Sequence, residues 1–256
     1  MTGLLDLVPL PLLVLAASIA VGAGVVKGAT GFAFPMIMIS TLGSFLPPQI
    51  ALAALIVPTV VTNGFQAFRE GPAAAWDAVR AHWLFVLVVS ICLILSAQLV
   101  GLLDPRVIFL AIGVPITLFA IFQLGGWRLR ITPGSKRKVE ISAAAFAGAV
   151  GGFSGVWGPP TVAYLTALDT PKTEAVRTQG VIFGLSSILL LLAHMNSGVL
   201  NAQTWPLSLA MVVPALLGLK IGQGLQDSMD QVRFRRFTLI VLVVAGLNLI
   251  RRALAG

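Results

Sequence analysis

The sequence predicts an all-α integral membrane protein, on three observations. Of the 256 residues, 57% are hydrophobic, and the mean hydropathy is +0.97. Only 10% are charged, whereas soluble domains carry about 25%. Apolar runs such as 83–103 and 107–124 are long enough for helices that cross a membrane. These runs recur along the whole chain, so no sizeable soluble domain is expected, and the lipid bilayer is the expected surrounding.

An internal repeat divides the chain into two halves. Shifting the sequence by 124 residues superimposes glycines and prolines, the residues that interrupt helices. The matched pairs include Gly24 with Gly148, Gly28 with Gly152, Gly31 with Gly155 and Pro35 with Pro159. A shift of 125 continues the similarity more weakly to the end of the chain. We therefore expect a first transmembrane repeat over 1–125, a basic cytoplasmic linker over 126–140 and a second transmembrane repeat over 141–256.

Each repeat contains about five hydrophobic segments. They cover 4–27, 32–46, 50–68, 81–103 and 107–124 in the first repeat, and 141–151, 159–168, 175–193, 205–224 and 237–250 in the second. An odd number of segments places the two repeats in opposite orientations. In this inverted arrangement most Lys and Arg residues fall on the side of the linker, as the positive-inside tendency requires of the cytoplasm. If the first two segments formed one continuous crossing, the basic residues would be divided more evenly.

The net charge of +8 has two explanations, an anionic partner such as nucleic acid or basic residues gathered in cytoplasmic loops. The charges lie between apolar runs, so topology explains them, and we expect no nucleic-acid partner. Cys92 is the single cysteine, which excludes an intramolecular disulfide and a Cys-rich metal site. We expect no cofactor and no metal, and the oligomeric state stays open. No Lys or Arg precedes Lys27, so we expect the N-terminal segment to be retained rather than cleaved as a signal peptide.

Both repeats contain a helix break, G-A-T-G-F-A-F-P at 28–35 and G-G-F-S-G-V-W-G-P-P at 151–160. The stretch 140–151 provides only roughly 16 Å of helix, about half of the hydrocarbon core. We therefore expect the first two segments of each repeat to form a broken helical hairpin with its tip near mid-depth, although two thin spans have the same parity. Free N–H groups at the start of the returning helix suit an anion, and two inverted breaks at the midplane are typical of secondary transporters. The alternative is that the glycines serve only close helix packing.

The motif at 151–160, together with K-G-A-T-G-F-A-F-P at 27–35 and P-K-T-E-A-V-R-T at 171–178, resembles the TauE/SafE family of membrane transporters, also called sulfite exporters. The likeness covers nearly the whole chain. It implies transport of small anions, such as sulfite, sulfonates or related organic acids, across a bacterial inner membrane. Two departures from the family pattern reshape the expected pocket. The first repeat carries single glycines where many relatives have a denser run, and Trp157 stands where a small residue is common.

Six candidate substrate-binding residues belong to the first repeat: Lys27, Thr30, Gly31, Pro35, Asn63 and Gln66. Lys27 is either an intramembrane cation that serves an anion or a lysine that snorkels to the cytoplasmic interface. The Thr30 hydroxyl either caps the following helix or donates to a bound oxyanion. Gly31 and Pro35 form the break itself. Asn63 and Gln66 place two amides on one helix face, where they either join helices or line the pathway.

Seven more candidates belong to the second repeat: Ser154, Trp157, Pro159, Thr161, Tyr164, Arg177 and Gln179. Ser154 corresponds to Thr30 and has the same two interpretations. Trp157, Thr161 and Tyr164 line a cavity, unless the two aromatic residues are lipid-interface anchors. Arg177 is either a bidentate ligand of a sulfonate or carboxylate or a loop residue paired with Glu174. Lys220 is expected to snorkel.

The motif G-F-S-G at 152–155 suggests a competing class, a rhomboid-like intramembrane serine protease with Ser154 as nucleophile and His194 as base. The repeat maps Ser154 onto Thr30 with the flanking glycines kept, so symmetry explains the motif without catalysis. We therefore expect no enzyme. No Asp or Glu lies deep in an apolar segment, which leaves the coupling ion open.

Overall fold

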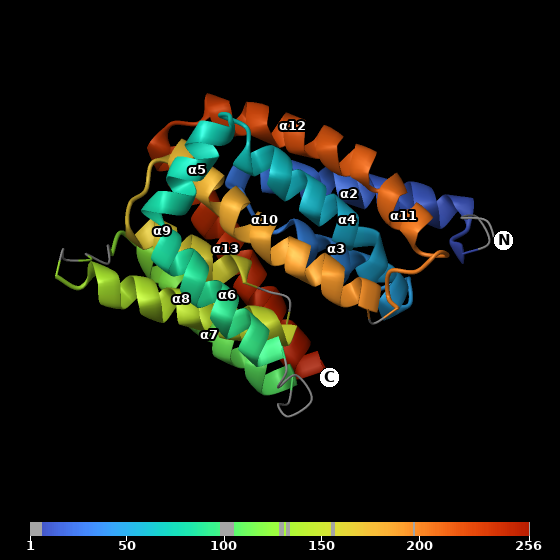
Figure 1. Ribbon diagram of the computed structural model, residues 1–256, viewed down its shortest axis with the longest axis horizontal. Coiled ribbons are helices and arrows are strands. Elements are labelled where there is room, and N and C mark those ends of the chain that lie inside the picture. Colours follow the sequence, from blue (N-terminus) through green and yellow to red (C-terminus); the bar gives the residue numbers. More distant parts are fainter. Residues whose placement is uncertain are drawn as a thin grey trace. The chain divides into compact units, whose positions relative to one another are not determined.

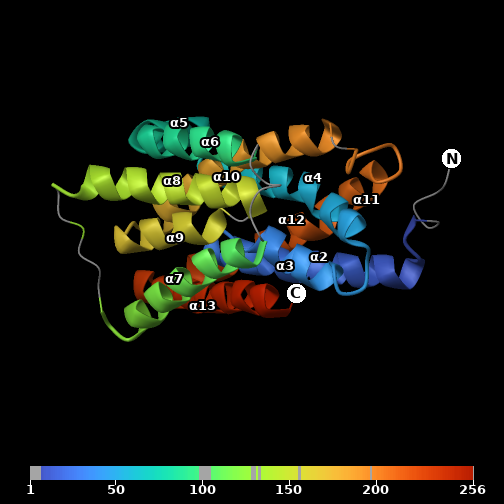
Figure 2. The ribbon, with the colours of Figure 1, turned by 90° about the horizontal axis from the view of Figure 1, so that it is seen from below.

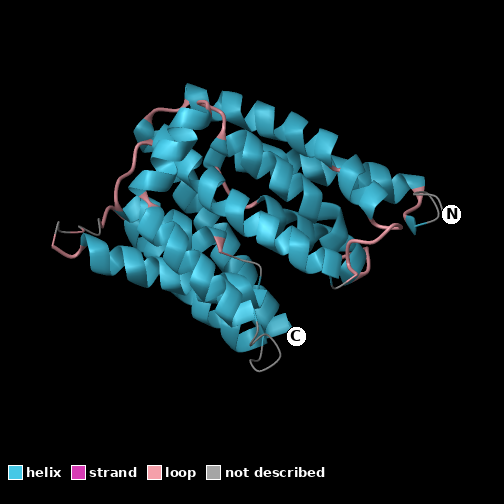
Figure 3. Ribbon diagram, viewed as in Figure 1, coloured by secondary structure: helices cyan, strands magenta, loops and turns pink. Residues whose placement is uncertain are grey.

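The computed structural model describes residues 7–97, 105–127, 131, 134–154, 157–196 and 198–255. Within these ranges the chain consists of helices and loops and forms no strand (Figure 3). Five helices are long and apolar enough to cross a membrane, or six if a bent pair counts as one span. The prediction of an all-helical, multi-pass membrane protein is confirmed.

The helices follow one another through both repeats (Figure 1). Their bounds are α2 Leu10–Thr30, α3 Phe34–Leu42, α4 Pro48–Ala67, α5 Pro72–Ala81, α6 Trp83–Ala97, α7 Pro105–Leu124, α8 Lys136–Ser154, α9 Gly158–Ala167, α10 Lys172–Asn196, α11 Trp205–Ala210, α12 Val212–Ser228 and α13 Gln231–Ala255.

The helices gather into two compact units. The first comprises residues 1–69 and 180–229, and the second comprises 70–179 and 230–256. Each unit therefore combines helices from both repeats, and α10 passes from the second unit into the first at Gly180. The division into units is thus distinct from the division of the sequence into repeats.

In the first unit α2 packs along α12 (Figure 1). A seam of glycines permits this contact: a Cβ atom on Gly28 would lie 2.2 Å from the Leu219 carbonyl oxygen, and one on Gly218 would lie 2.1 Å from that of Val21. Only glycine fits at such distances. The packing interpretation of Gly28 is therefore confirmed, and Gly24 lies in the same seam.

In the second unit α6 packs along α8, and α7 packs along α13 (Figure 2). A Cβ atom on Gly148 would lie 2.4 Å from the Val89 carbonyl oxygen, so this glycine also serves close packing. The predicted repeat relates these two pairs, since a shift of 124 residues brings α2 onto α8 and α6 onto the range of α12.

The helix breaks lie at corresponding positions. Helix α2 ends at Thr30 and α8 at Ser154, and the returning helices begin at Phe34 and Gly158, so both pairs are separated by 124 residues. The expected first arm of the second repeat, 140–151, was too short: α8 has 19 residues, because the helix continues through its packing glycine Gly148. In the first repeat α2 ends at Thr30, three residues beyond the expected segment 4–27. An interior glycine costs a helix only about 1 kcal/mol, which close packing offsets.

Prolines begin the returning helices, as predicted. Pro35 and Pro159 occupy the first turns of α3 and α9, where the missing N–H has no partner to lose. Gly31 ends α2 with φ 90°, a left-handed conformation that favours glycine, and its N–H donates to the Lys27 carbonyl oxygen at 2.6 Å.

The expected segment 81–103 is found as α6 over 83–97, and residues 98–103 lie outside the described residues. The sequence did not predict α5, which precedes α6 and is bent from it by 76° at a break at His82. Helix α5 carries exposed Asp77 and Arg80, so hydropathy alone did not include it in the membrane segment.

Candidate functional site

Lys27 lies in the last turn of α2 and is buried, with 1% of its surface exposed. Its Nζ donates a hydrogen bond to Asn63 Oδ1 on α4. Within the described ranges Lys27 is the only buried Lys, Arg, Asp or Glu side chain, and no carboxylate there forms an ion pair with it. The alternative that Lys27 snorkels to the interface is therefore wrong, whereas Lys220 on α12 is exposed, as snorkelling requires.

Asn63 is fixed in place by α10. Its Nδ2 donates to the Phe183 carbonyl oxygen at 3.1 Å and to Ser187 Oγ at 3.3 Å, which directs Oδ1 towards the ammonium of Lys27. Ser187 in turn donates to the Gly184 carbonyl oxygen at 2.9 Å, so its hydroxyl oxygen is available to accept. Ser187 follows Asn63 by 124 residues, so two corresponding residues of the repeats contact each other directly.

Gln66, the second candidate on α4, binds the first break. Its Nε2 donates to the Gly31 carbonyl oxygen at 3.1 Å, and its side chain is buried. Asn63 and Gln66 thus hold the end of α2 from one face of α4. Both amides join helices, and they do so around the buried lysine.

Thr30 is buried at the end of α2, and its role as a cap stays a prediction. Its hydroxyl donates to the Val26 carbonyl oxygen at 2.8 Å, within α2. The N-cap of α3 is Ala33, which has φ 74° and makes no side-chain cap bond. Pro35 follows in the first turn and is partly buried. The first amides of α3 have no carbonyl partner within their own helix, so the break presents N–H groups.

The charge of Lys27 needs compensation. An ammonium removed from water and left unpaired costs several kcal/mol, and a neutral amide oxygen offsets only part of that cost. The position at the carboxyl end of α2 contributes favourably through the helix dipole, by about 0.3–1 kcal/mol. The cluster of Lys27, Asn63, Gln66 and Gly31, which we call the lysine cluster, therefore suits an anion.

At the second break the aromatic candidates are buried rather than turned to lipid. Trp157 is 5% exposed and Tyr164 is 4% exposed, so the interpretation as interface anchors is wrong for both. Tyr164 stacks on Phe85 with ring centroids 5.0 Å apart. Thr161 Oγ1 donates to the Trp157 carbonyl oxygen at 2.9 Å, and Pro159 is buried beside it in the first turn of α9. The side chain of Ser154 lies outside the described residues.

Arg177 forms an ion pair with Glu70, which the sequence did not indicate. The expected partner Glu174 lies closer in sequence, but the Arg177 guanidinium reaches the loop between α4 and α5 instead. Arg177 is partly buried. Its charge is therefore balanced within the second unit, unlike that of Lys27 in the first.

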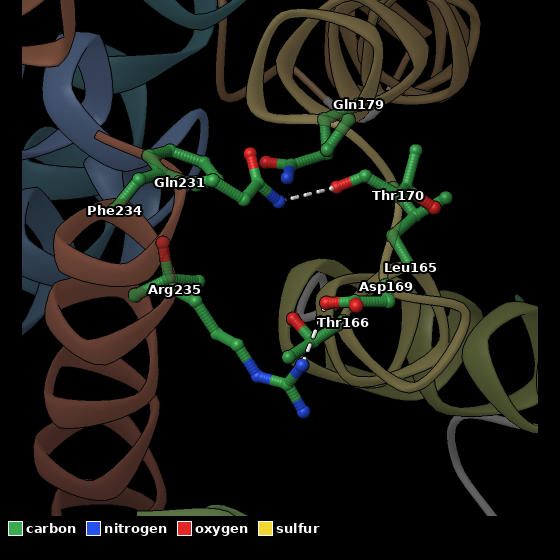
Figure 4. Close-up of a pocket in the computed structure, with 10 residues that line it drawn as sticks. Leu165, Thr166, Asp169, Thr170, Gln179, Gln231, Phe234 and Arg235 are labelled. Atoms are coloured by element: carbon green, nitrogen blue, oxygen red, sulfur yellow. Dashed lines mark hydrogen bonds and ion pairs between the residues drawn. The ribbon is translucent and has the colours of Figure 1, made fainter. Parts of the chain in front are cut away.

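Gln179 lines a small cavity in the second unit (Figure 4). Arg235 on α13 donates to Asp169 Oδ1 and to Gln123 Oε1, each at 2.6 Å. Gln231 donates to the Thr170 carbonyl oxygen at 3.1 Å. The cavity has a volume of about 20 Å³, enough for about one water molecule. The cavity is too small for an organic anion. The hydrogen bonds of Arg235 and Gln231 beside it connect the α9–α10 loop to α13.

Sequence reasoning missed Ser187, Glu70 and the Arg235 group. A signal existed for Ser187, because the shift of 124 residues leads to it directly from Asn63. The contacts of Arg235 with Asp169 and Gln123 could not be predicted, because the positive-inside pattern already explained a basic residue at this helix end.

A family model described as sulfite exporter TauE/SafE matches residues 16–249. The matched range includes both helix breaks and the whole lysine cluster. The comparisons with curated proteins and with solved structures gave no match.

Proposed function

The chain belongs to the TauE/SafE family of membrane transporters, and we propose that it carries small anions, such as sulfite, sulfonates or related organic acids. Transport proceeds by alternating access around a midplane site formed by the two helix breaks. The first break supplies the charge through the lysine cluster. The second supplies Trp157, Thr161 and Tyr164 as the wall of the pathway.

One observation carries the proposal. Lys27 is a buried lysine in a membrane helix, and the described hydrogen bond of its Nζ goes to a neutral amide. Intramembrane cations are rare, and they mark substrate or ion pathways unless they are paired. An anion bound between Lys27 and the first N–H groups of α3 would compensate the charge of Lys27 and would also accept hydrogen bonds from those N–H groups.

The other cations are less suited to this role. Arg177 is engaged by Glu70, and Arg235 by Asp169. We place these ion pairs at the cytoplasmic ends of the helices, in an inverted topology in the bacterial inner membrane with the linker 126–140 in the cytoplasm. A reporter fused after Gly125 should read cytoplasmic, and a periplasmic reading would contradict this topology.

The proposal is tested by anion transport in proteoliposomes with sulfite, methanesulfonate, sulfoacetate, taurine and short carboxylates. Lys27→Met keeps an unbranched side chain that is one atom shorter and removes the charge. Loss of a buried charged ligand should reduce transport about 30-fold or more. Lys220→Met is the matched control, because this lysine is exposed on α12 and should leave transport unchanged. Wild-type rates in Lys27→Met would refute the site.

We do not propose a protease activity, because the 124-residue shift that maps Ser154 onto Thr30 explains the G-F-S-G motif without catalysis, and the family is one of transporters. Labelling of Ser154 by a fluorophosphonate probe would contradict this conclusion.

A further inference from the structure

The charge around Lys27 limits which anions the site can hold. The described hydrogen bonds in and around the lysine cluster join Lys27 only to neutral groups: the amides of Asn63 and Gln66, the Ser187 hydroxyl and the Phe183 and Gly31 carbonyls make up this network. Lys27 is the one buried Lys, Arg, Asp or Glu side chain in the part of the chain that the structure describes. The cluster therefore has a net charge of +1 as long as Lys27 is protonated.

The hydrogen-bond donors point to the same limit. An ammonium has three N–H donors, and Asn63 accepts one of those of Lys27. The amide nitrogens of Asn63 and Gln66 already donate to Phe183, Ser187 and Gly31. The charged donors at the cluster are therefore those of the single Lys27 ammonium, and the backbone N–H groups at the break add neutral ones.

We infer that the site selects monovalent anions and rejects divalent anions of the same shape. The inference rests on the proposed function, because it requires that Lys27 holds the substrate. A monoanion makes a neutral pair with the ammonium. A dianion leaves one buried negative charge facing carbonyl oxygens, and an uncompensated buried charge is strongly unfavourable. Sulfonates, carboxylates and hydrogen sulfite are then the transported class, while sulfate and doubly ionised sulfite are not.

Methanesulfonate and sulfate make a matched pair, since a methyl group in one replaces a charged oxygen in the other. Both are offered separately to proteoliposomes that contain the wild-type protein, at equal concentration and constant pH. We expect methanesulfonate to be transported about 100-fold faster or more, which reflects the penalty of an uncompensated charge. Sulfate in excess should also fail to inhibit methanesulfonate transport.

The two proposals fail differently in this experiment. If sulfate and methanesulfonate are transported at similar rates and Lys27→Met abolishes both, the inference on charge is wrong and the proposed function stands. If Lys27→Met leaves methanesulfonate transport intact, the assignment of the site to Lys27 is wrong and the inference fails with it. If the wild-type protein transports no anion, the proposed function is wrong as well.

A variant pair tests the charge independently of the choice of substrate. Asn63→Asp would place a carboxylate against Lys27 and bring the net charge of the cluster to zero, whereas Asn63→Leu keeps it at +1 with a side chain of similar size. We expect Asn63→Asp to fall to the transport level of Lys27→Met and Asn63→Leu to retain measurable transport. Monodisperse elution in size-exclusion chromatography confirms that both variants fold. Equal methanesulfonate transport by folded Asp and Leu variants would overturn the inference.

Discussion

At the first break Lys27 precedes Gly31 by one helical turn, and Ala33 follows it. A shift of 124 residues places Gly151 and Trp157 at the positions of Lys27 and Ala33. A Cβ atom on Gly151 would lie 3.0 Å from the Cβ atom and 3.3 Å from Cε3 of Trp157, so the indole fills the space beside this glycine. One repeat thus has a long side chain before the break and a small one after it, and the other has the reverse.

The backbone conformations of Ala33 and Trp157 are consistent with this difference in side-chain size. Ala33 has φ 74°, a conformation that costs a residue with a Cβ atom about 1–2 kcal/mol and is worse for a bulky side chain. Trp157 has φ −88° and ψ −13°, which any residue adopts easily. The comparison teaches that breaks at matched positions of the sequence need not share the same chemistry. We propose that one copy keeps the charge and the other keeps an aromatic wall.

The largest effect is expected from disrupting the helix that carries the lysine. Gly28→Ala places a Cβ atom within 2.2 Å of the Leu219 carbonyl oxygen, and we expect it to destabilise the first unit by about 3 kcal/mol. Gly22→Ala is the control, because nothing lies within 4 Å of the added atom. Thermal unfolding of the purified proteins measures the difference. Equal melting temperatures would show that α2 and α12 do not pack as described.

The next largest effect on stability is expected from changing the side-chain sizes of Gly151 and Trp157 at the second break. Gly151→Leu should destabilise the second unit by about 2–3 kcal/mol through overpacking against Trp157. Trp157→Ala alone should cost about 3 kcal/mol because it leaves a cavity. The double variant should be more stable than the sum of the two changes, since the leucine then occupies the space that the indole leaves. If the destabilisation of the double variant in thermal unfolding equals the sum of the two single changes, Gly151 and Trp157 do not share this space.

The smallest effect concerns the orientation of Asn63. Ser187→Ala removes one of the two acceptors of its amide and leaves the Phe183 carbonyl. Loss of one such hydrogen bond should lower the affinity for methanesulfonate about threefold to tenfold. Ser186→Ala is the matched control, since the Ser186 hydroxyl is also buried but donates to the Ile182 carbonyl oxygen within α10. An equal loss in both variants would mean that the hydrogen bond to Asn63 is unimportant.

Much of this fold could be predicted because hydropathy, Gly and Pro act locally. The membrane helices, both break positions and the prolines of the first turns follow from those signals. The length of α8 could not be predicted, because Gly148 weakens the isolated helix but packs against Val89 in the folded protein. Whether a glycine breaks a helix depends on its neighbours in space.

The candidate site was predicted as residues but not as contacts. Lys27, Asn63 and Gln66 were each named from the sequence, yet their bonds to one another and to α10 depend on tertiary packing. The partner of Arg177 was wrongly predicted for the same reason. The sequence suggested Glu174, three residues away, but the long Arg177 side chain reaches Glu70, which is distant in sequence and close in the fold. The midplane meeting of the two breaks stays a prediction.

Direct observation of the Lys27 ammonium separates anion binding from a purely structural role. The side-chain nitrogen of lysine can be followed by NMR in ¹⁵N-lysine-labelled protein in nanodiscs, with Lys27→Met used to assign its signal. The site described above predicts that methanesulfonate shifts the Lys27 signal in a saturable manner and leaves that of exposed Lys220 in place. An unchanged Lys27 signal at methanesulfonate concentrations that saturate transport would contradict the assignment of this lysine as the anion ligand.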